Sequence, residues 1–375
     1  MISKKTLVFT CNTAFGIANF RSGVLCALKE KGHRVIVVAP PDSINEIRLK
    51  SIGVEFVPWF VSGKGVFIFS EIASILSLIK IYIKIHPSIC FHFTIKAVIY
   101  GAIASKCTGH KFVSVITGLG YVFLNNSWIS KVAQLLYRIT LKFSSEIWFL
   151  NKDDQQVFYK LKLTSDIPSI ILPGEGINLQ LFSPENTISN NQNINYTFLL
   201  IARLLRDKGI YEFVEAARIV LRNNPNTRFQ LLGEVGSDNP SSIGIDQVKN
   251  WCDEGIVEYL GVTNDVREAI GKADCIVLPS YREGIPRCLM EAAAMQKPLI
   301  TTDVPGCKDV VINGKTGWLC KSKDENDLAK KMIMIINTPK DRLLNMGILG
   351  RELMKKCFDE KIVIDLYIKA VNRLI

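Results

Sequence analysis

Short apolar runs alternate along this chain with longer segments in which apolar residues recur at helical spacing. Residues 6–10 form the first apolar run, residues 18–31 the first helical segment and residues 34–38 the second run. Gly32 stands between the helical segment and the second run, where a helix would end. Strand–helix–strand units of this kind predict a parallel β-sheet covered by helices. Because the alternation continues for most of the chain, the pattern predicts the α/β class.

A polar segment divides the chain into two halves. The chain has 375 residues, which is enough for two domains that each bury a core. Residues 183–193 are mostly polar and end in Asn-Asn-Gln-Asn, which predicts a linker. A new strand over 196–202 and a helix over 210–222 open the second half, and residues 324–375 have helical periodicity.

The stretch 275–295 is the most informative part of the sequence. An apolar strand, 275–278, runs into a loop, and Pro286 suits the first turn of the helix that follows. The loop therefore ends at a helix N-terminus, where free N–H groups and the helix dipole attract anions. Glu283 stands in the loop and Glu291 about one turn inside the helix. Carboxylates for hydroxyl groups beside an anion site predict a sugar-nucleotide site, although both could also be ordinary solvated side chains.

Two other strand–loop–helix turns carry candidate ligand groups. Arg203 and Lys208 lie between the strand 196–202 and its helix, where a basic pair can clamp a phosphate group. Gly16 follows the first strand, where a loop must let a ligand approach the backbone. No Gly-x-Gly-x-x-Gly pattern accompanies it, so a dinucleotide site is poorly supported.

The spacing of Glu283 and Glu291, eight positions apart with Gly-Ile-Pro after the first, resembles the motif of retaining glycosyltransferases of family 4. The resemblance implies a GT-B fold, in which two Rossmann-like domains have parallel sheets facing across a cleft. It assigns residues 1–190 to acceptor binding, residues 191–355 to UDP-sugar binding and residues 356–375 to a helix that packs back on the first domain.

The resemblance also implies roles for individual residues. Catalysis would depend on Glu283, Arg203 and Lys208. The donor-binding candidates are Gly16, Arg203, Lys208, Gly233, Val262, Thr263, Glu283, Gly284, Ile285, Pro286, Arg287 and Glu291. The acceptor-binding candidates follow instead from their positions near the ends of two strands of the first domain, where such sheets bind ligands; they are His92, Lys96, Thr117, Gly118 and Gly120. His92 also fits a core residue of its apolar strand.

Thr117-Gly-Leu-Gly120 and the phrase Phe93-Thr-Ile-Lys-Ala resemble a bacterial branch of the family that extends lipid-linked oligosaccharide precursors. This implies transfer of N-acetylgalactosamine, or another hexose, from a UDP-sugar to an undecaprenyl-diphosphate-linked saccharide in O-antigen, capsule or glycan precursor synthesis. A GT-B sugar-nucleotide epimerase is the alternative. No Asp-x-Asp follows an apolar strand convincingly, so we expect neither a metal nor a cofactor. Whether Glu283 is a nucleophile or a positioning group stays open.

Charge and cysteine content bear on partners and location. The net charge is +11, and residues 1–193 hold 20 Lys and Arg against 11 Asp and Glu, which favours an anionic partner. No nucleic-acid-binding motif accompanies this charge, so a nucleic-acid binder is poorly supported. The ten cysteines form no Cys-x-x-Cys pair, which suggests reduced thiols in a cytoplasmic protein.

One stretch, 66–85, suggests a membrane surface. It is largely apolar, carries Lys80 and Lys84, and follows Lys64, as an amphipathic helix at a lipid surface does. A helix that covers the sheet would show the same pattern. Glycine and asparagine residues interrupt the uncharged run 112–130, so no transmembrane helix is expected. We therefore predict a peripheral protein at the inner face of the cytoplasmic membrane.

Overall fold

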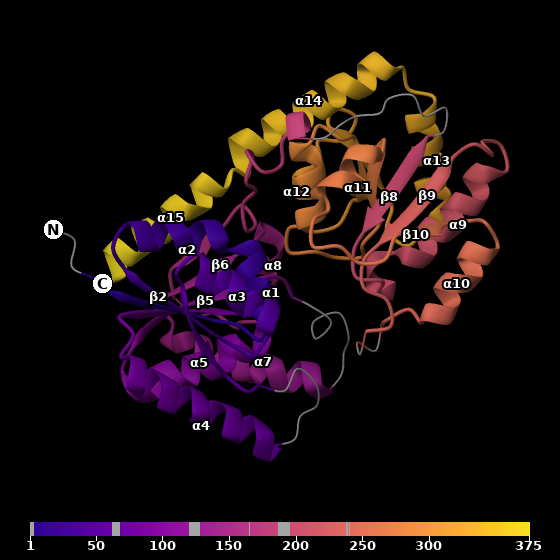
Figure 1. Cartoon of the computed structure of the whole chain (residues 1–375). Coiled ribbons are helices and arrows are strands. Elements are labelled where there is room, and N and C mark those ends of the chain that lie inside the picture. The colour runs from indigo at the N-terminus through magenta and orange to yellow at the C-terminus, as the bar shows by residue number, and fades with distance from the viewer. Residues whose placement is uncertain are drawn as a thin grey trace. The chain divides into compact units, whose positions relative to one another are not determined.

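The computed structural model divides the chain into two compact units. It describes residues 4–61, 68–119, 128–164, 166–186, 196–237, 239 and 241–375. The first unit is Met1–Gly176 with Glu360–Ile375, and the second is Ile177–Asp359 (Figure 1). The division thus falls earlier than residue 190. Most of the linker that the sequence predicts lies in 187–195, outside the described residues.

The first unit is built on a seven-stranded parallel sheet in the order β3-β2-β1-β4-β5-β6-β7. The inner strands are buried over almost their whole length, which explains why they read as continuous apolar runs in the sequence. The strands are β1 (Thr6–Thr10), β2 (Arg34–Ala39), β3 (Glu55–Pro58), β4 (Ile89–Phe93), β5 (Lys111–Ile116), β6 (Glu146–Phe149) and β7 (Ser169–Ile171).

Helices connect these strands. They are α1 (Ala14–Phe20), α2 (Ser22–Glu30), α3 (Ser43–Ser51), α4 (Ile68–Ile85), α5 (Ile95–Thr108), α7 (Trp128–Thr140) with the turn η1 (Leu141–Phe143), and α8 (Lys152–Lys160). The first segment that the sequence predicts as one helix is divided into α1 and α2 at Arg21. Arg21 is buried and donates a hydrogen bond to the Gly16 carbonyl oxygen, so its side chain turns back into the unit.

The last helix, α15 (Glu360–Leu374), belongs to the first unit, as predicted for a GT-B fold. Its Tyr367 is fully buried, with ring centroids 4.8 Å from Trp148 and 5.1 Å from Phe91. Arg373 holds the buried carboxylate of Glu146 at 2.5 Å. This aromatic packing fixes the C-terminal helix on the sheet of the first unit.

The second unit contains a six-stranded parallel sheet in the order β10-β9-β8-β11-β12-β13. Its strands are β8 (Thr197–Ile201), β9 (Arg228–Leu232), β10 (Glu258–Tyr259), β11 (Cys275–Leu278), β12 (Leu299–Thr302) and β13 (Gly317–Cys320). The helices and turns are η2 (Pro184–Asn186), η3 (Arg206–Lys208), α9 (Ile210–Leu221), α10 (Ile245–Asp253), α11 (Arg267–Lys272), α12 (Arg287–Ala294), η4 (Lys308–Val310), α13 (Glu325–Ile336) and α14 (Lys340–Cys357). Two parallel sheets with connecting helices confirm the predicted α/β class.

Candidate active site

Three loops meet at the carboxyl edge of the second sheet. They follow β8, β11 and β12, which are neighbours in that sheet. The backbone N–H of Tyr281 donates to the Asp207 carbonyl oxygen at 2.9 Å, and that of Glu283 donates to the Pro305 carbonyl oxygen at 3.1 Å. These bonds hold the loop 279–286, which the sequence singled out, between the other two loops.

Two glycines allow this close approach. Gly209 and Gly306 have φ angles of +74° and +82°, which disfavour any residue with a side chain. A Cβ atom at Gly209 would overlap the carbonyl oxygen of Pro279, and one at Gly306 would overlap that of Glu283. The position of the Glu283 backbone therefore depends on a glycine that lies 23 residues further along the chain.

The structure brings Lys208 and Glu283 into direct contact. Lys208 Nζ lies 2.5 Å from Glu283 Oε1, and both side chains are mostly buried. Burial by itself lowers the pKa of Lys208, but attraction and hydrogen bonding from Glu283, with a further contribution from Asp207, outweigh it and raise that pKa. Lys208 is therefore a protonated cation held on the loop where the sequence places a phosphate clamp.

Arg203 adds a second cation to this site. Its side chain is exposed, and among the described residues it forms no ion pair or side-chain hydrogen bond. Its charge acts to lower the pKa of Lys208, so the two cations lie within electrostatic reach of each other. Because Arg203 has no ion-pair partner among the described residues, its positive charge is available to an anionic ligand.

The loop 279–286 ends at the start of α12. Pro286 is its N-cap with an extended backbone, and Gly284 and Ile285 lead into it. Inside the helix, Glu291 is buried and accepts a hydrogen bond from Arg287 Nε at 2.8 Å. Burial raises the pKa of Glu291, although Arg287 opposes the shift. In this structure Arg287 therefore supports the Glu291 carboxylate.

The remaining donor candidates of the second unit lie on neighbouring loops. Gly233 follows β9, and its N–H donates to the Gly261 carbonyl oxygen at 2.8 Å. Val262 is 69% exposed, and the hydroxyl of Thr263 accepts from the Asp265 N–H at 3.1 Å. The charge of Asp265 contributes to the raised pKa of Glu291, so this loop lies close to α12.

Gly16 is the only donor candidate that lies in the first unit. Thr13 caps α1 by accepting a hydrogen bond from the Gly16 N–H at 3.1 Å. Arg21 binds the Gly16 carbonyl oxygen at 2.7 Å and forms a buried ion pair with Glu175. No local pattern in the sequence predicts this ion pair, because 154 residues separate its partners.

The acceptor candidates have different surroundings. His92 is fully buried, and its Nε2 lies 3.1 Å from the Tyr82 hydroxyl. Burial lowers the pKa of His92 to about 3, so it is a neutral core residue and not a surface ligand. Thr117 and Gly118 follow β5, and Gly118 has a φ angle of +136°. Gly120 lies outside the described residues.

Lys96 lies in the first turn of α5 and forms an ion pair that sequence reasoning missed. Its Nζ lies 2.6 Å from Glu71 Oε1, and the other oxygen of Glu71 accepts from the Tyr100 hydroxyl. Glu71 is buried on the inner side of α4. The available signal was that Glu71 is the one acidic residue in the apolar stretch 66–85.

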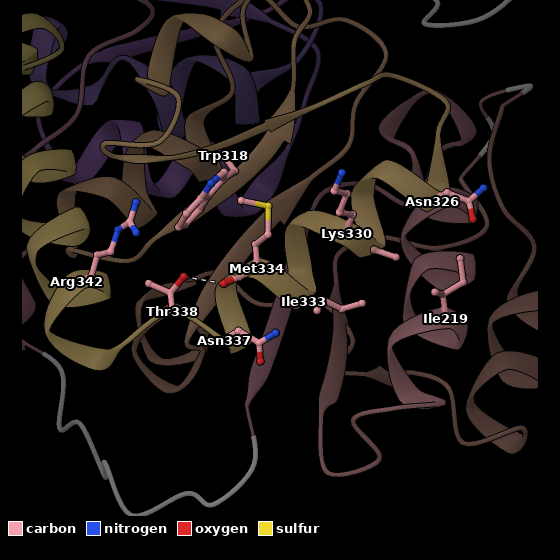
Figure 2. A pocket seen from close by; sticks show the side chains of 10 residues that line it. Ile219, Trp318, Asn326, Lys330, Ile333, Met334, Asn337, Thr338 and Arg342 are labelled. Atoms are coloured by element: carbon pink, nitrogen blue, oxygen red, sulfur yellow. Dashed lines mark hydrogen bonds between the residues drawn. The ribbon is translucent and has the colours of Figure 1, made fainter.

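A cavity of about 450 Å³ lies elsewhere in the second unit, beside α9, α13 and α14 (Figure 2). Trp318, Met334 and Arg342 contribute to its lining, and no candidate residue does. Within the described ranges, no three His, Cys, Asp or Glu side chains gather as a metal-ligand set. In the same ranges, no helix combines the length and apolar character needed to cross a bilayer.

Each unit contains a segment that matches a known sequence family. Residues 184–351 match the family model of glycosyl transferases group 1, and residues 9–151 match that of the glycosyl transferase 4-like domains. The chain thus combines a glycosyl transferase 4-like domain with a group 1 domain, and it is a glycosyltransferase. Among solved structures, Anabaena HepE in complex with UDP-glucose superimposes on this glycosyltransferase with a TM-score of 0.81 at 14% identity, over 98% of this chain and all of that one. A glycosyltransferase from Rickettsia africae reaches a TM-score of 0.78 at 16% identity, over 99% of both chains.

Relatives of known activity resemble this glycosyltransferase along its length. The Campylobacter jejuni N,N'-diacetylbacillosaminyl-diphospho-undecaprenol alpha-1,3-N-acetylgalactosaminyltransferase is 27% identical over 98% of both chains. An Escherichia coli enzyme, UDP-Gal:alpha-D-GlcNAc-diphosphoundecaprenol alpha-1,3-galactosyltransferase, is 24% identical over 79% of this chain and 77% of its own. The resemblance that the sequence motif suggests is thereby confirmed.

Proposed function

We propose that this glycosyltransferase moves a sugar from a UDP-sugar to a saccharide linked to undecaprenyl diphosphate, with retention of the anomeric configuration. The observation that carries the proposal is the contact of Lys208 with Glu283 beside the free cation Arg203 and the start of α12. The two relatives that act on diphosphoundecaprenol-linked sugars support the acceptor class. The first of them favours N-acetylgalactosamine as the donor sugar.

Each part of the donor has a matching group in the second unit. The buried carboxylate of Glu291 holds the ribose hydroxyls, supported by Arg287. Arg203, Lys208 and the N–H groups at the start of α12 hold the diphosphate. The exposed loop of Val262 and Thr263 contacts the base through its backbone. Gly16 of the first unit stays a predicted donor-binding residue.

The chemistry follows from where charge develops. The bond between the sugar anomeric carbon and the UDP oxygen breaks, and the acceptor hydroxyl oxygen forms the new bond on the same face of the sugar. The hydroxyl proton passes to the departing phosphate oxygen. Negative charge grows on UDP, so Arg203 and Lys208 stabilise the transition state more than the ground state. Glu283 positions the donor sugar while it holds Lys208.

We propose that this cationic site replaces a metal ion. EDTA then leaves activity nearly intact, because Arg203 and Lys208 already neutralise the leaving group. Transfer rates with and without EDTA, on protein freed of divalent ions, test this. Complete loss of activity that Mg²⁺ or Mn²⁺ restores would contradict it.

The acceptor and the location are proposed together. Lys96, Thr117 and Gly118 lie at the carboxyl edge of the first sheet, where they can meet the acceptor. The lipid-borne acceptor sits at a membrane face, so the enzyme binds the inner face of the cytoplasmic membrane peripherally, through the basic first unit. The described cysteines are all free thiols, which suits that reducing compartment.

A panel of UDP-sugars assayed against synthetic undecaprenyl and short-chain diphosphate acceptors tests the function. We expect one UDP-sugar to be transferred, with the anomeric configuration and linkage read by NMR. If the sugar of a UDP-sugar is epimerised without any acceptor, the protein is an epimerase. An inverted product would contradict the retaining mechanism.

A further inference from the structure

Two helices of the first unit each expose a stripe of apolar side chains. The stripe on α4 consists of Phe69, Ile72, Leu76 and Ile83, and the stripe on α7 and η1 consists of Trp128, Val132, Leu135, Ile139 and Phe143. Spacings of three, four and seven residues place each set on one side of its helix. The opposite sides, which include Tyr82 and Tyr137, are buried in the core.

The two helices cover the same face of the seven-stranded sheet. Both α4 and α7 pack against α5, which is buried along most of its length. The inner residues of all three helices share one hydrophobic core. Figure 1 shows α4, α5 and α7 gathered on one side of the first unit. The two exposed stripes therefore point away from that sheet.

The same helices expose cations and no carboxylate. Glu71 is the one acidic residue in the described residues of α4, α7 and η1, and it is buried against Lys96. The exposed cations are Lys80 and Lys84 on α4, Lys131 and Arg138 on α7, and Lys142 on η1. An apolar surface surrounded by cations alone is complementary to an anionic lipid surface.

The most exposed aromatic residues stand at the starts of the two helices. Phe69 is 88% exposed and Trp128 is 66% exposed. In parallel sheets with helical crossovers, helices start at the edge where the strands end. Thr117 and Gly118 follow β5 at this edge, and Lys96 lies there in the first turn of α5. The aromatic pair thus lies at the same edge as the proposed acceptor residues.

We propose that α4 and α7 together form one docking surface for an anionic bilayer, with Phe69 and Trp128 inserted at the edge that receives the acceptor. The inference rests on the proposed function, because a lipid-borne acceptor requires such a surface. The lysine stems can lie along the apolar stripes while their charges reach the lipid headgroups. A second copy of the chain is a poor occupant of this surface. If it bound through the same surface, the five cations of one copy would face the same five cations of the other.

Trp128 gives this surface its own spectroscopic reporter. The chain has five tryptophans, and Trp59, Trp148, Trp251 and Trp318 are at most 6% exposed. A change of tryptophan emission on vesicles therefore reports Trp128. On mixed phosphatidylglycerol and phosphatidylcholine vesicles we expect a blue shift, and quenching by lipids brominated on their chains. Trp128→Phe should remove both signals and keep vesicle binding.

Paired variants test the energetics. Phe69→Ser with Trp128→Ser should weaken binding to the anionic vesicles about tenfold or more, since burying one large apolar side chain is worth at least that factor. Leu344→Ser with Ile348→Ser, exposed by 58% and 41% on α14 of the second unit, is the matched control and should change nothing. Thermal melting checks that both pairs fold.

The outcomes separate this inference from the proposed function. Vesicle binding without any change in Trp128 emission would place the lipid contact elsewhere and overturn the inference, while the transferase proposal stands. Light scattering tests the alternative occupant. A dimer that dissociates when Phe69 and Trp128 are changed to Ser would show that a second copy covers the surface and would overturn the inference. Transfer to a short soluble acceptor tests the transferase alone, and its absence for every UDP-sugar would reject the proposed function.

Discussion

Lys208 and Glu283 form an ion pair of 2.5 Å although 75 residues separate them in the chain. Their loops follow β8 and β11, which lie side by side in the second sheet. The pair joins the proposed phosphate clamp to the proposed sugar-binding loop. Loss of either partner would leave a mostly buried charge without its counter-ion, so the two side chains support each other's position.

Arg203→Ala and Lys208→Ala should each lower kcat more than they raise KM. The charge on departing UDP grows toward the transition state, and removal of one such donor costs about 10²–10³-fold in kcat in other enzymes. Steady-state kinetics over a range of UDP-sugar concentrations measure both constants. An increase in KM alone would show that the cations only bind the donor. Lys249→Ala, an exposed lysine of α10, serves as control.

Glu291→Ala should weaken donor binding, because it removes hydrogen bonds from a charged group to the ribose. Such bonds are worth about 1.5–3 kcal/mol each. Calorimetric titration with UDP measures the loss, and Glu325→Ala, at a partly exposed residue in the first turn of α13, is a suitable control. Unchanged affinity for UDP would reject the ribose assignment.

Donor affinity should also fall at mildly acidic pH. Burial raises the pKa of Glu291, so this carboxylate takes up a proton at higher pH than an ordinary glutamate, whose pKa is about 4.3. As the pH falls through the raised value, the group loses its charge and its full accepting capacity. UDP affinity measured against pH should decline in that range. In Glu291→Gln this part of the decline should be absent.

Gly306→Ala should damage activity more than Gly314→Ala. Both glycines have positive φ angles, +82° and +75°, so both substitutions strain the backbone by a similar amount. Only Gly306 has the Glu283 carbonyl oxygen where the new Cβ would lie, whereas the space at Gly314 is open. We expect kcat to fall at Gly306 and to stay near the parent value at Gly314. Equal effects would mean that backbone strain alone is responsible.

Charge reversal of Lys80 and Lys84 should reduce binding to anionic vesicles and activity on long-chain acceptors. Each lysine near an anionic surface contributes about 1 kcal/mol to membrane binding. Added salt should therefore also weaken vesicle binding by the unchanged protein. Activity on a short soluble acceptor should be spared. Equal loss on both acceptors would mean that α4 only covers the sheet. Lys249→Glu with Lys330→Glu, exposed in the second unit, controls for net charge.

The sequence by itself determined the local elements and their order. Apolar runs, helical periodicity and the glycine or proline at their ends predicted the parallel α/β class, which the structure confirms. It also placed Arg203, Lys208 and Glu283 on turns that follow strands, and Glu291 in the helix after one of these turns. These features depend on neighbours within a few residues, which is why a sequence can reveal them.

Only the tertiary structure decided which groups meet and which are exposed. The contact of Lys208 with Glu283 depends on the adjacency of β8 and β11, which no local pattern specifies. From the sequence, His92 could be a ligand or a core residue. The structure shows that it is fully buried, with its Nε2 beside the Tyr82 hydroxyl, so it is a core residue. The exposure of Trp128 likewise depends on α7 turning its other side to α5. Burial is a property of the packed layers, so it becomes known only when distant segments are in place.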